Sequence, residues 1–129
     1  MKNYFERVKN YLDTLGYTYT YESEEEGVFV VQNNQKKIDN LVIGIADPIL
    51  LMEQYIFPLN GDSVEMFKYL LKKNRDIVHG AFVLDDDSEK VIFRDTLQIE
   101  NLDLNELEGS LDSLSLLIAE LAEDIKQFK

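Results

Sequence analysis

Residues 66–107 read MFKYLLKKNRDIVHGAFVLDDDSEKVIFRDTLQIENLDLNEL, and this stretch decides the fold. Its first part has the spacing of an amphipathic helix as far as Asn74, a residue type that often ends helices in the left-handed conformation. Two apolar runs follow, at 79–84 and 90–94, on either side of an acidic turn at 85–88. Apolar runs bounded by turn residues are typical of strands. The stretch therefore predicts a helix, a β-hairpin and the start of a second helix.

The rest of the chain extends this pattern. Helices are expected at residues 3–15, 62–73 and 104–128. Each begins with a capping box, in which an Asn or Asp precedes a Glu by three residues: Asn3 and Glu6, Asp62 and Glu65, Asp103 and Glu106. Strands are expected at residues 17–22, 28–31, 41–46, 49–57, 79–84 and 90–94. The order αββββαββα predicts an α+β fold with an antiparallel β-sheet of about six strands and three helices.

Length and composition predict one domain that spans residues 1–129, because a chain of this size with 45% hydrophobic residues can bury a core. The chain has no cysteine, so it forms no disulfides or thiolate metal sites, and it suits a reducing compartment. No apolar run is long enough to span a membrane, and the N-terminus lacks the apolar segment of a secretion signal. We therefore expect a cytoplasmic protein with no membrane partner.

The net charge of −12 argues against nucleic acid as a partner, since phosphate binding needs a basic face. The main basic cluster, Lys68, Lys72, Lys73 and Arg75, has helical spacing and is interpreted as a solvated helix face. Residues 98–125 contain eight acidic side chains and no Lys or Arg. This acidic stretch would repel acidic partners and attract basic ones.

The sequence contains no set of residues that predicts catalysis. His79 is the only histidine, and it stands beside a glycine at the start of a predicted strand. General acid–base catalysis usually needs a histidine or a carboxyl group with a shifted pKa in a pocket, together with a second group. No Gly-x-Ser-x-Gly elbow and no glycine-rich phosphate loop is present. We predict a protein that is not an enzyme and has no cofactor, and an enzyme that uses carboxylates alone is the weakest alternative.

A calcium loop is the one metal motif that the sequence approaches. Asp85, Asp87 and Glu89 match its first three ligands. However, the sixth position is Lys90 where a calcium loop has Gly, and the twelfth is Thr96 where it has Glu. Because the sharp turn and the bidentate ligand are both missing, we interpret the segment as a solvated hairpin turn and predict no metal site.

The last predicted helix carries a heptad repeat of apolar residues. Its members are Leu104, Leu107, Leu111, Leu114, Ile118, Leu121, Ile125 and Phe128. Such a repeat forms either the core under a sheet or the contact of a coiled-coil dimer. Core packing is favoured, since a sheet face must be covered and acidic residues elsewhere on the helix would repel a parallel copy. Gly109 and Ser110 are weak helix formers and could interrupt the helix.

Two groups of aromatic and apolar residues are candidate protein contacts. In the second predicted helix, Val64, Phe67, Leu70 and Leu71 form the expected inward face, which leaves Tyr69 on the solvent side. Tyr69 and Met66 are therefore candidates for a dimer contact. Tyr17, Tyr19 and Tyr21 alternate along the first strand. They form either a core face under the long helix, which is favoured, or a surface for a client protein.

The middle and C-terminal part of the chain resembles the YbjN family, which belongs with the Tir-chaperone-like (type III secretion chaperone-like) proteins. The matching residues are Leu70, Leu71, Asn74, Gly80, Phe82, Leu84, Asp85, Val91, Ile92, Leu97 and 102–111. The resemblance implies a small acidic α+β protein, commonly a homodimer, that holds extended segments of another protein on apolar surface. The charge leaves a second hypothesis open, an acidic inhibitor or immunity protein that neutralises a basic toxin or nuclease. A YbjN-type regulator remains a third possibility.

Overall fold

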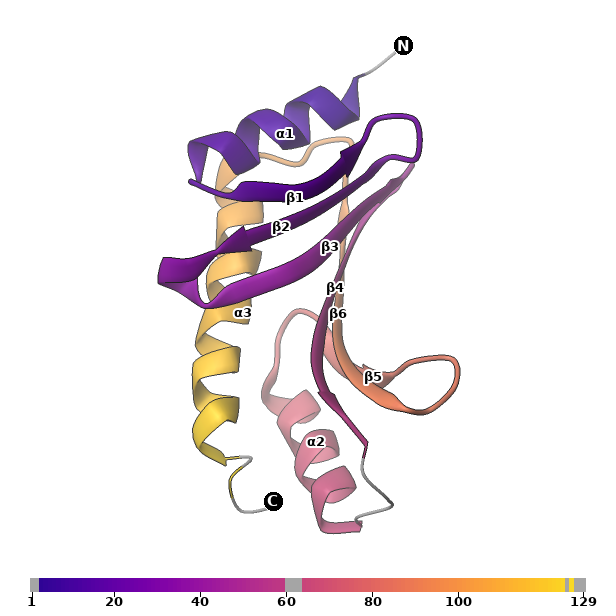
Figure 1. The fold of residues 1–129 in the computed structure, drawn as a ribbon, viewed down its shortest axis with the longest axis vertical. Helices are drawn as coiled ribbons and strands as arrows, with labels where there is room; N and C mark the ends of the chain where they lie inside the picture. The colour runs from indigo at the N-terminus through magenta and orange to yellow at the C-terminus, as the bar shows by residue number, and fades with distance from the viewer. Residues whose placement is uncertain (1–2, 60–63, 125, 127–129) are drawn as a thin grey trace.

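The computed structural model describes residues 3–59, 64–124 and 126. In chain order its elements are α1 (Tyr4–Thr14), β1 (Thr18–Ser23), β2 (Val28–Asn33), the 3-10 turn η1 (Asn34–Lys36), β3 (Ile38–Ala46), β4 (Ile49–Pro58), α2 (Val64–Asp76), β5 (Ala81–Leu84), β6 (Lys90–Gln98) and α3 (Leu104–Asp124). The strands form one antiparallel six-stranded sheet in the order β1-β2-β3-β4-β6-β5 (Figure 1). The predicted α+β fold and element order are confirmed.

The core lies on one face of the sheet, which we call the inner face. Side chains alternate along each strand, and the inner positions of the central strands are buried: Phe29, Val31, Leu41, Ile43, Leu50, Met52, Val91 and Phe93. The long helix α3 crosses behind this face in Figure 1. Its own buried residues are Leu107, Ser110, Leu111, Leu114, Leu117 and Leu121. The apolar faces of the strands and of α3 therefore pack together in one core, as the amphipathic patterns predict.

Helix α1 covers β1 and β2 at one end of the sheet (Figure 1). The ring of Phe5 stacks on the ring of Phe29, with centroids 4.3 Å apart. The predicted N-cap is present, since Asn3 Oδ1 accepts a hydrogen bond from the backbone N–H of Glu6 at 3.0 Å. The chain then leaves the helix through Gly16, which has φ of +83°, a conformation that glycine adopts without strain.

Helix α3 is continuous through Gly109 and Ser110, and its heptad positions from Leu107 to Leu121 pack into or against this chain's own core. Packing against the sheet offsets the weak helix propensity of these two residues. The buried stripe is wider than the predicted repeat, because Ser110 and Leu117 are also buried. The predicted residues Ile125 and Phe128 lie outside the described residues.

Helix α2 differs most from its prediction. It continues to Asp76, so Asn74 does not end it in the left-handed conformation. Instead, the Asn74 side chain accepts a hydrogen bond from Phe82 N–H at 2.7 Å and donates one to Phe82 C=O at 3.2 Å. An amide can pair with a strand residue in this way because it carries both a donor and an acceptor. The predicted cap at Asp62 lies outside the described residues.

The Asn74 contact gives a prediction for stability. Asn74→Ala should lower the free energy of unfolding by about 2 kcal/mol, because two hydrogen bonds between α2 and β5 are lost and the Phe82 backbone groups lose their partner. Asn74→Asp keeps the acceptor and should lose less. Urea denaturation of the three proteins measures the difference, and equal stability of Asn74→Ala and the wild type would contradict the assignment.

Candidate protein-binding surfaces

Large apolar side chains remain exposed at several places in the described part of the chain. They are Tyr21, Val42, Ile49, Tyr55, Val64, Leu71, Val78, Leu84 and Leu116. Single exposed apolar residues are normal, whereas groups of them mark contact sites. These residues fall on three surfaces of the molecule, each built from a different combination of elements.

The first surface is a groove between α2 and the β5–β6 hairpin, which we call the helix–hairpin groove. It has a volume of about 190 Å³ and is lined by Phe67, Leu70, Leu71, Asn74, Phe82, Val83, Leu84 and Val91. Leu71 is 70% exposed, and Val64, about two helical turns earlier in α2, is 63% exposed. The sequence prediction that Val64 and Leu71 face inward is therefore wrong. Leu70 is the buried residue of this helix.

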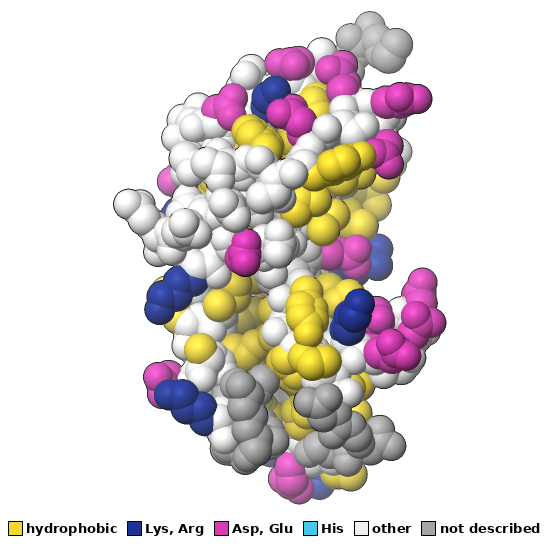
Figure 2. All heavy atoms as spheres, viewed as in Figure 1, with side chains coloured by type: hydrophobic (Ala, Val, Ile, Leu, Met, Phe, Trp, Pro, Cys, Tyr) yellow, Lys and Arg dark blue, Asp and Glu magenta, His cyan; other side chains and the backbone are white. Residues whose placement is uncertain are grey.

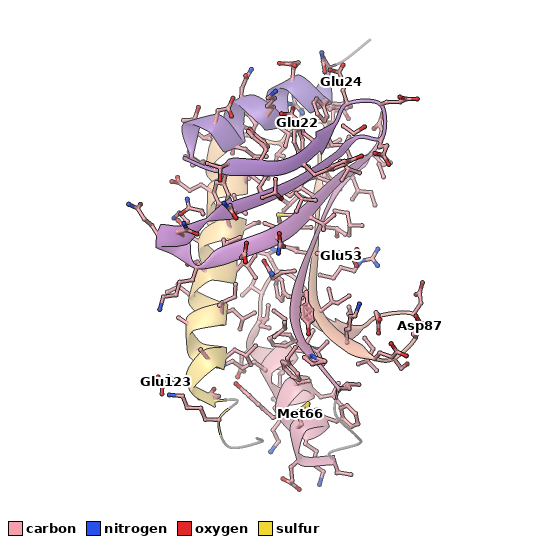
Figure 3. The ribbon with its side chains drawn as sticks, in the orientation of Figure 1. Glu22, Glu24, Glu53, Met66, Asp87 and Glu123 are labelled. Carbon is pink, nitrogen blue, oxygen red and sulfur yellow. The ribbon has the colours of Figure 1, made fainter. Side chains whose placement is uncertain are left out.

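Met66 and Tyr69, the predicted dimer contacts, lie on the side of α2 that packs against the core (Figure 3 shows Met66). The Tyr69 hydroxyl donates a hydrogen bond to the Asp124 carboxylate of α3 at 2.6 Å. Burial raises the pKa of Tyr69, and the bond to Asp124 raises it further. The prediction of a solvent-facing Tyr69 is thus wrong, because α3 occupies that side of the helix. Periodicity alone does not show which side of a short helix a later helix will cover.

The second surface lies between the end of α2 and the outward side of α3. This groove has a volume of about 430 Å³, and its lining includes Val78, His79, Leu116 and Leu117. Val78 is almost fully exposed, and Leu116 is largely exposed. The side walls are charged, since Lys73 Nζ lies 2.8 Å from the Glu120 carboxylate. The groove therefore offers apolar area beside an ion pair.

The third surface is the face of the sheet opposite the core, which we call the outer face. Its exposed residues include Tyr21, Val42, Ile49 and Tyr55. In the view of Figure 2, apolar side chains gather on this side of the molecule with acidic ones at their margin. α3 lies behind these strands in Figure 1. A sheet face with this many exposed apolar side chains is a candidate contact surface.

The three tyrosines of the first strand are separated by the structure. Tyr17 precedes β1 and is buried, and Tyr19 packs against Phe29 under α1. The single Tyr19 hydroxyl hydrogen is shared between two acceptors on α1, the Lys9 carbonyl at 3.0 Å and the Asp13 carboxylate at 2.6 Å. A β-bulge follows: Tyr19 is opposite Val31, but Tyr21 is opposite Val30. The extra residue reverses the alternation. Tyr21 therefore lies on the outer face, half exposed, with its hydroxyl bonded to Glu26.

Tyr17 and Tyr19 give opposite predictions at neutral pH. Tyr19→Phe should lower the free energy of unfolding by about 1 to 2 kcal/mol, because the shared hydrogen bond from its hydroxyl to α1 is lost. Tyr17→Phe should be neutral or stabilising, because its buried hydroxyl has no hydrogen-bond partner in the described structure. Urea denaturation at neutral pH compares the two variants, and a larger loss from Tyr17→Phe would contradict these contacts.

The same residues predict a loss of stability at high pH. Burial raises the pKa of Tyr17, and nearby Asp112 adds to the shift. The pKa of this tyrosine is therefore higher in the folded chain than in the unfolded chain, where it is about 10. The stability of the fold is complete below about pH 10 and decreases as the pH rises above that value. The wild type should therefore unfold more easily above about pH 10, and Tyr17→Phe should reduce this pH dependence.

The ionisable residues that the sequence singled out are dispersed. The Asp85 carboxylate accepts hydrogen bonds from the backbone N–H groups of Glu89 at 2.7 Å and Lys90 at 2.9 Å, so it closes the hairpin turn. These bonds, that of Lys90 first, lower the pKa of Asp85. Among the described residues no three His, Cys, Asp or Glu side chains converge as a metal ligand set would.

Sequence reasoning missed one buried ionisable residue, Asp95 on the inner face of β6. It is 5% exposed, and burial raises its pKa, while the Thr96 backbone and the charge of His79 act in the opposite direction. The groove between α2 and α3, the second surface above, is lined by His79 but not by Asp95. The alternation of β6 would have placed residue 95 inward, so the signal was present in the strand period.

Within residues 3–59, 64–124 and 126, none of the helices combines the length and the hydropathy that a bilayer-spanning segment requires.

Comparison with known proteins identifies relatives of this architecture. The CesT_Tir_1 family model matches residues 1–129. None of the curated proteins matches the sequence. Among solved structures, YbjN from E. coli is 16% identical, with 92% of this chain and 91% of that chain covered and a TM-score of 0.68.

Two further similar structures are complexes. A chain of the HopA1–SchA chaperone–effector complex is 13% identical, covers 94% of this chain and 95% of its own length, and has a TM-score of 0.70. The Yersinia pestis type III secretion chaperone SycH, solved with a fragment of YscM2, is 21% identical, with coverage of 92% and 98% and a TM-score of 0.64. These likenesses establish a fold of the secretion-chaperone type.

Proposed function

This chain belongs to the CesT_Tir_1 family, and we propose that it is a non-enzymatic, chaperone-like protein that binds extended segments of a client protein and acts as a homodimer. The observation that carries the proposal is the grouping of exposed apolar side chains on three surfaces of a chain with a net charge of −12. The net negative charge opposes aggregation of the protein, while exposed apolar patches favour contact with another polypeptide.

The homodimer would form through the helix–hairpin groove. Leu71 projects from α2 beside this apolar groove, and Leu84 at its far wall is 45% exposed. In a two-fold dimer the same patch meets itself, so Leu71 of each copy can enter the groove of the other. Leu71 and Val64 are the residues we now assign to this contact. Met66 and Tyr69 would support it from the core side of α2.

Client binding would use the outer face and the groove that contains Leu116. Extended segments bind to proteins by adding to strand edges or by placing apolar side chains in grooves. The SycH and HopA1–SchA structures each contain a chaperone together with a second protein, which supports a protein partner for this chain. Of the three tyrosines proposed as client contacts, Tyr21 is the most exposed, at 48%, so we propose the contact there.

A second hypothesis, an acidic inhibitor of a basic toxin or nuclease, is favoured by the net charge of −12. Three of the acidic residues near α3 already have partners within the chain. Lys36 pairs with Asp112, and Lys73 pairs with Glu120 at 2.8 Å and with Asp124 at 3.9 Å. These contacts reduce the charge that α3 can offer to a basic partner, so we rank inhibition second.

A pull-down of the tagged chain from its native host, performed at low and at high salt, tests the two hypotheses. A chaperone that binds through apolar surface should retain its partner at high salt, because salt does not weaken apolar contacts. An inhibitor should bind a single basic protein and lose it as salt rises. Retention of no protein at either salt concentration would count against both.

A further inference from the structure

The outer face has an open position at Gly44 in the second half of β3. A Cβ atom built at Gly44 would have no atom within 4 Å, so this position opens to space. Gly44 is paired with Val28 on β2 and with Leu51 on β4. Val42 and Ala46 flank it along its own strand. A glycine inside a strand weakens the strand and often marks close approach of another chain.

This position and its cross-strand neighbours face away from the core. Ile43, Leu50 and Met52 are buried on the inner face, so alternation directs Gly44, Leu51 and their neighbours outward. Val42 and Ile49 are each 39% exposed. We call the set Val28, Val42, Gly44, Ala46, Ile49 and Leu51 the Gly44 hollow. At its centre Gly44 has no side chain, and the residues around it in the set are apolar.

One end of the Gly44 hollow is acidic. The β1–β2 turn contains Glu24, Glu25 and Glu26, and the β3–β4 turn contains Asp47, and all four are exposed. The two turns lie together, since Ile45 N–H donates a hydrogen bond to Gly27 C=O at 2.7 Å. Glu24 lies at this end of the sheet in Figure 3. Residues 20–30 and 41–53 contain no Lys or Arg.

At the other end of the Gly44 hollow, a positive and a negative side chain form an ion pair. Glu53 and Arg94 are opposite each other on β4 and β6, with a closest N–O distance of 3.9 Å. The negative charge is therefore concentrated at the turn end. A ligand that fits this surface would combine an apolar side chain for the hollow with a positive charge beside it, placed toward Glu24–Glu26 and Asp47.

From this arrangement we propose that the Gly44 hollow docks an apolar side chain from a basic segment of the client protein. The inference rests on the proposed function and specifies the class of client. A second copy of this chain is a poor occupant, because a two-fold contact here would bring the same acidic turns together. An acidic or neutral segment would lack the charge complement at the turn end.

Gly44→Val tests the proposal because its effects on folding and on binding have opposite signs. The new side chain enters open space, and valine favours strands, so stability should be equal to or above that of the wild type. The same side chain fills the hollow. Its affinity for a short fluorescein-labelled peptide of alternating leucine and lysine should fall by about tenfold or more, measured by fluorescence anisotropy.

Two controls separate the hollow from general charge attraction. Gly109→Ala adds a side chain in open space on α3 and should leave peptide affinity unchanged. A peptide with glutamate in place of lysine should bind the wild type about tenfold more weakly or worse. Equal affinity of the wild type and Gly44→Val, or equal affinity for the two peptides, would overturn the proposal, as would no binding of the leucine–lysine peptide by the wild type.

A second variant covers the case in which Gly44→Val fails to fold. Val42→Lys places a positive charge at an exposed position of the same hollow and should weaken binding of the leucine–lysine peptide by a similar factor. Failure of the Gly44 proposal can be distinguished from failure of the proposed chaperone function. If the native-host pull-down retains a client at high salt and Gly44→Val retains it equally, the chaperone role stands and the Gly44 hollow is not the site.

Discussion

Leu71→Glu is expected to dissociate the proposed homodimer, with a rise of about 100-fold or more in the dissociation constant. Leu71 is 70% exposed within one chain, so a glutamate there remains solvated in the monomer. In the dimer the carboxylate would be transferred into the helix–hairpin groove, which is lined mainly by apolar side chains. Removing a charge from water without a partner costs several kcal/mol, which corresponds to this change in affinity.

Size-exclusion chromatography with light scattering measures the result. The wild type should have twice the mass of one 15.0 kDa chain, and Leu71→Glu should have the mass of one chain. Leu116→Glu is the matched control, because Leu116 is 68% exposed but lies on α3, outside the helix–hairpin groove. A monomeric wild type, or dissociation by both substitutions alike, would contradict this assignment.

Phe29→Ala is expected to destabilise the fold more than any other substitution considered above, by about 3 to 5 kcal/mol. Phe29 is fully buried, stacks on Phe5 and contacts the ring of Tyr19, so it connects β1, β2 and α1. Its removal leaves a cavity that the surrounding strands cannot close. Small domains have unfolding free energies of about 5 to 15 kcal/mol, so much of the stability would be lost.

Denaturant unfolding followed by circular dichroism checks this prediction. Val30→Ala is the control, since Val30 is the next residue on the same strand but faces the opposite side and is partly exposed. It should cost about 1 kcal/mol. Similar losses for the two variants would show that the inner face between α1 and β2 is not the packed core that the structure indicates.

Much of the fold could be predicted from the sequence because strand alternation and helix spacing are local properties. The apolar repeat of the last helix identified Leu107, Leu111, Leu114 and Leu121, and all of them are buried. The caps at Asn3 and Asp103 are present, with side-chain bonds to Glu6 N–H and Glu106 N–H. Short-range patterns of this kind are set by neighbours in the chain and need no knowledge of the tertiary fold.

The candidate surfaces were less predictable because each depends on contacts between distant elements. Tyr69 is half-buried because α3 returns past α2, 55 residues later in the chain, where Asp124 accepts a hydrogen bond from the Tyr69 hydroxyl. Tyr21 changed faces because of a bulge that the alternation did not reveal. Asn74 pairs with Phe82 in place of ending its helix. Asn74 and Phe82 are both among the residues that resemble the YbjN family, but a sequence match does not show that their groups are in contact.

Hydrogen–deuterium exchange of the complex captured from the native host tests the central claim most directly. A chaperone-like role predicts that the bound client segment exchanges as unfolded chain outside the contact and is protected only where it touches this protein. Within this chain, protection should increase at β3 and β4 on the outer face. A captured partner that is folded throughout and releases at high salt would contradict the account.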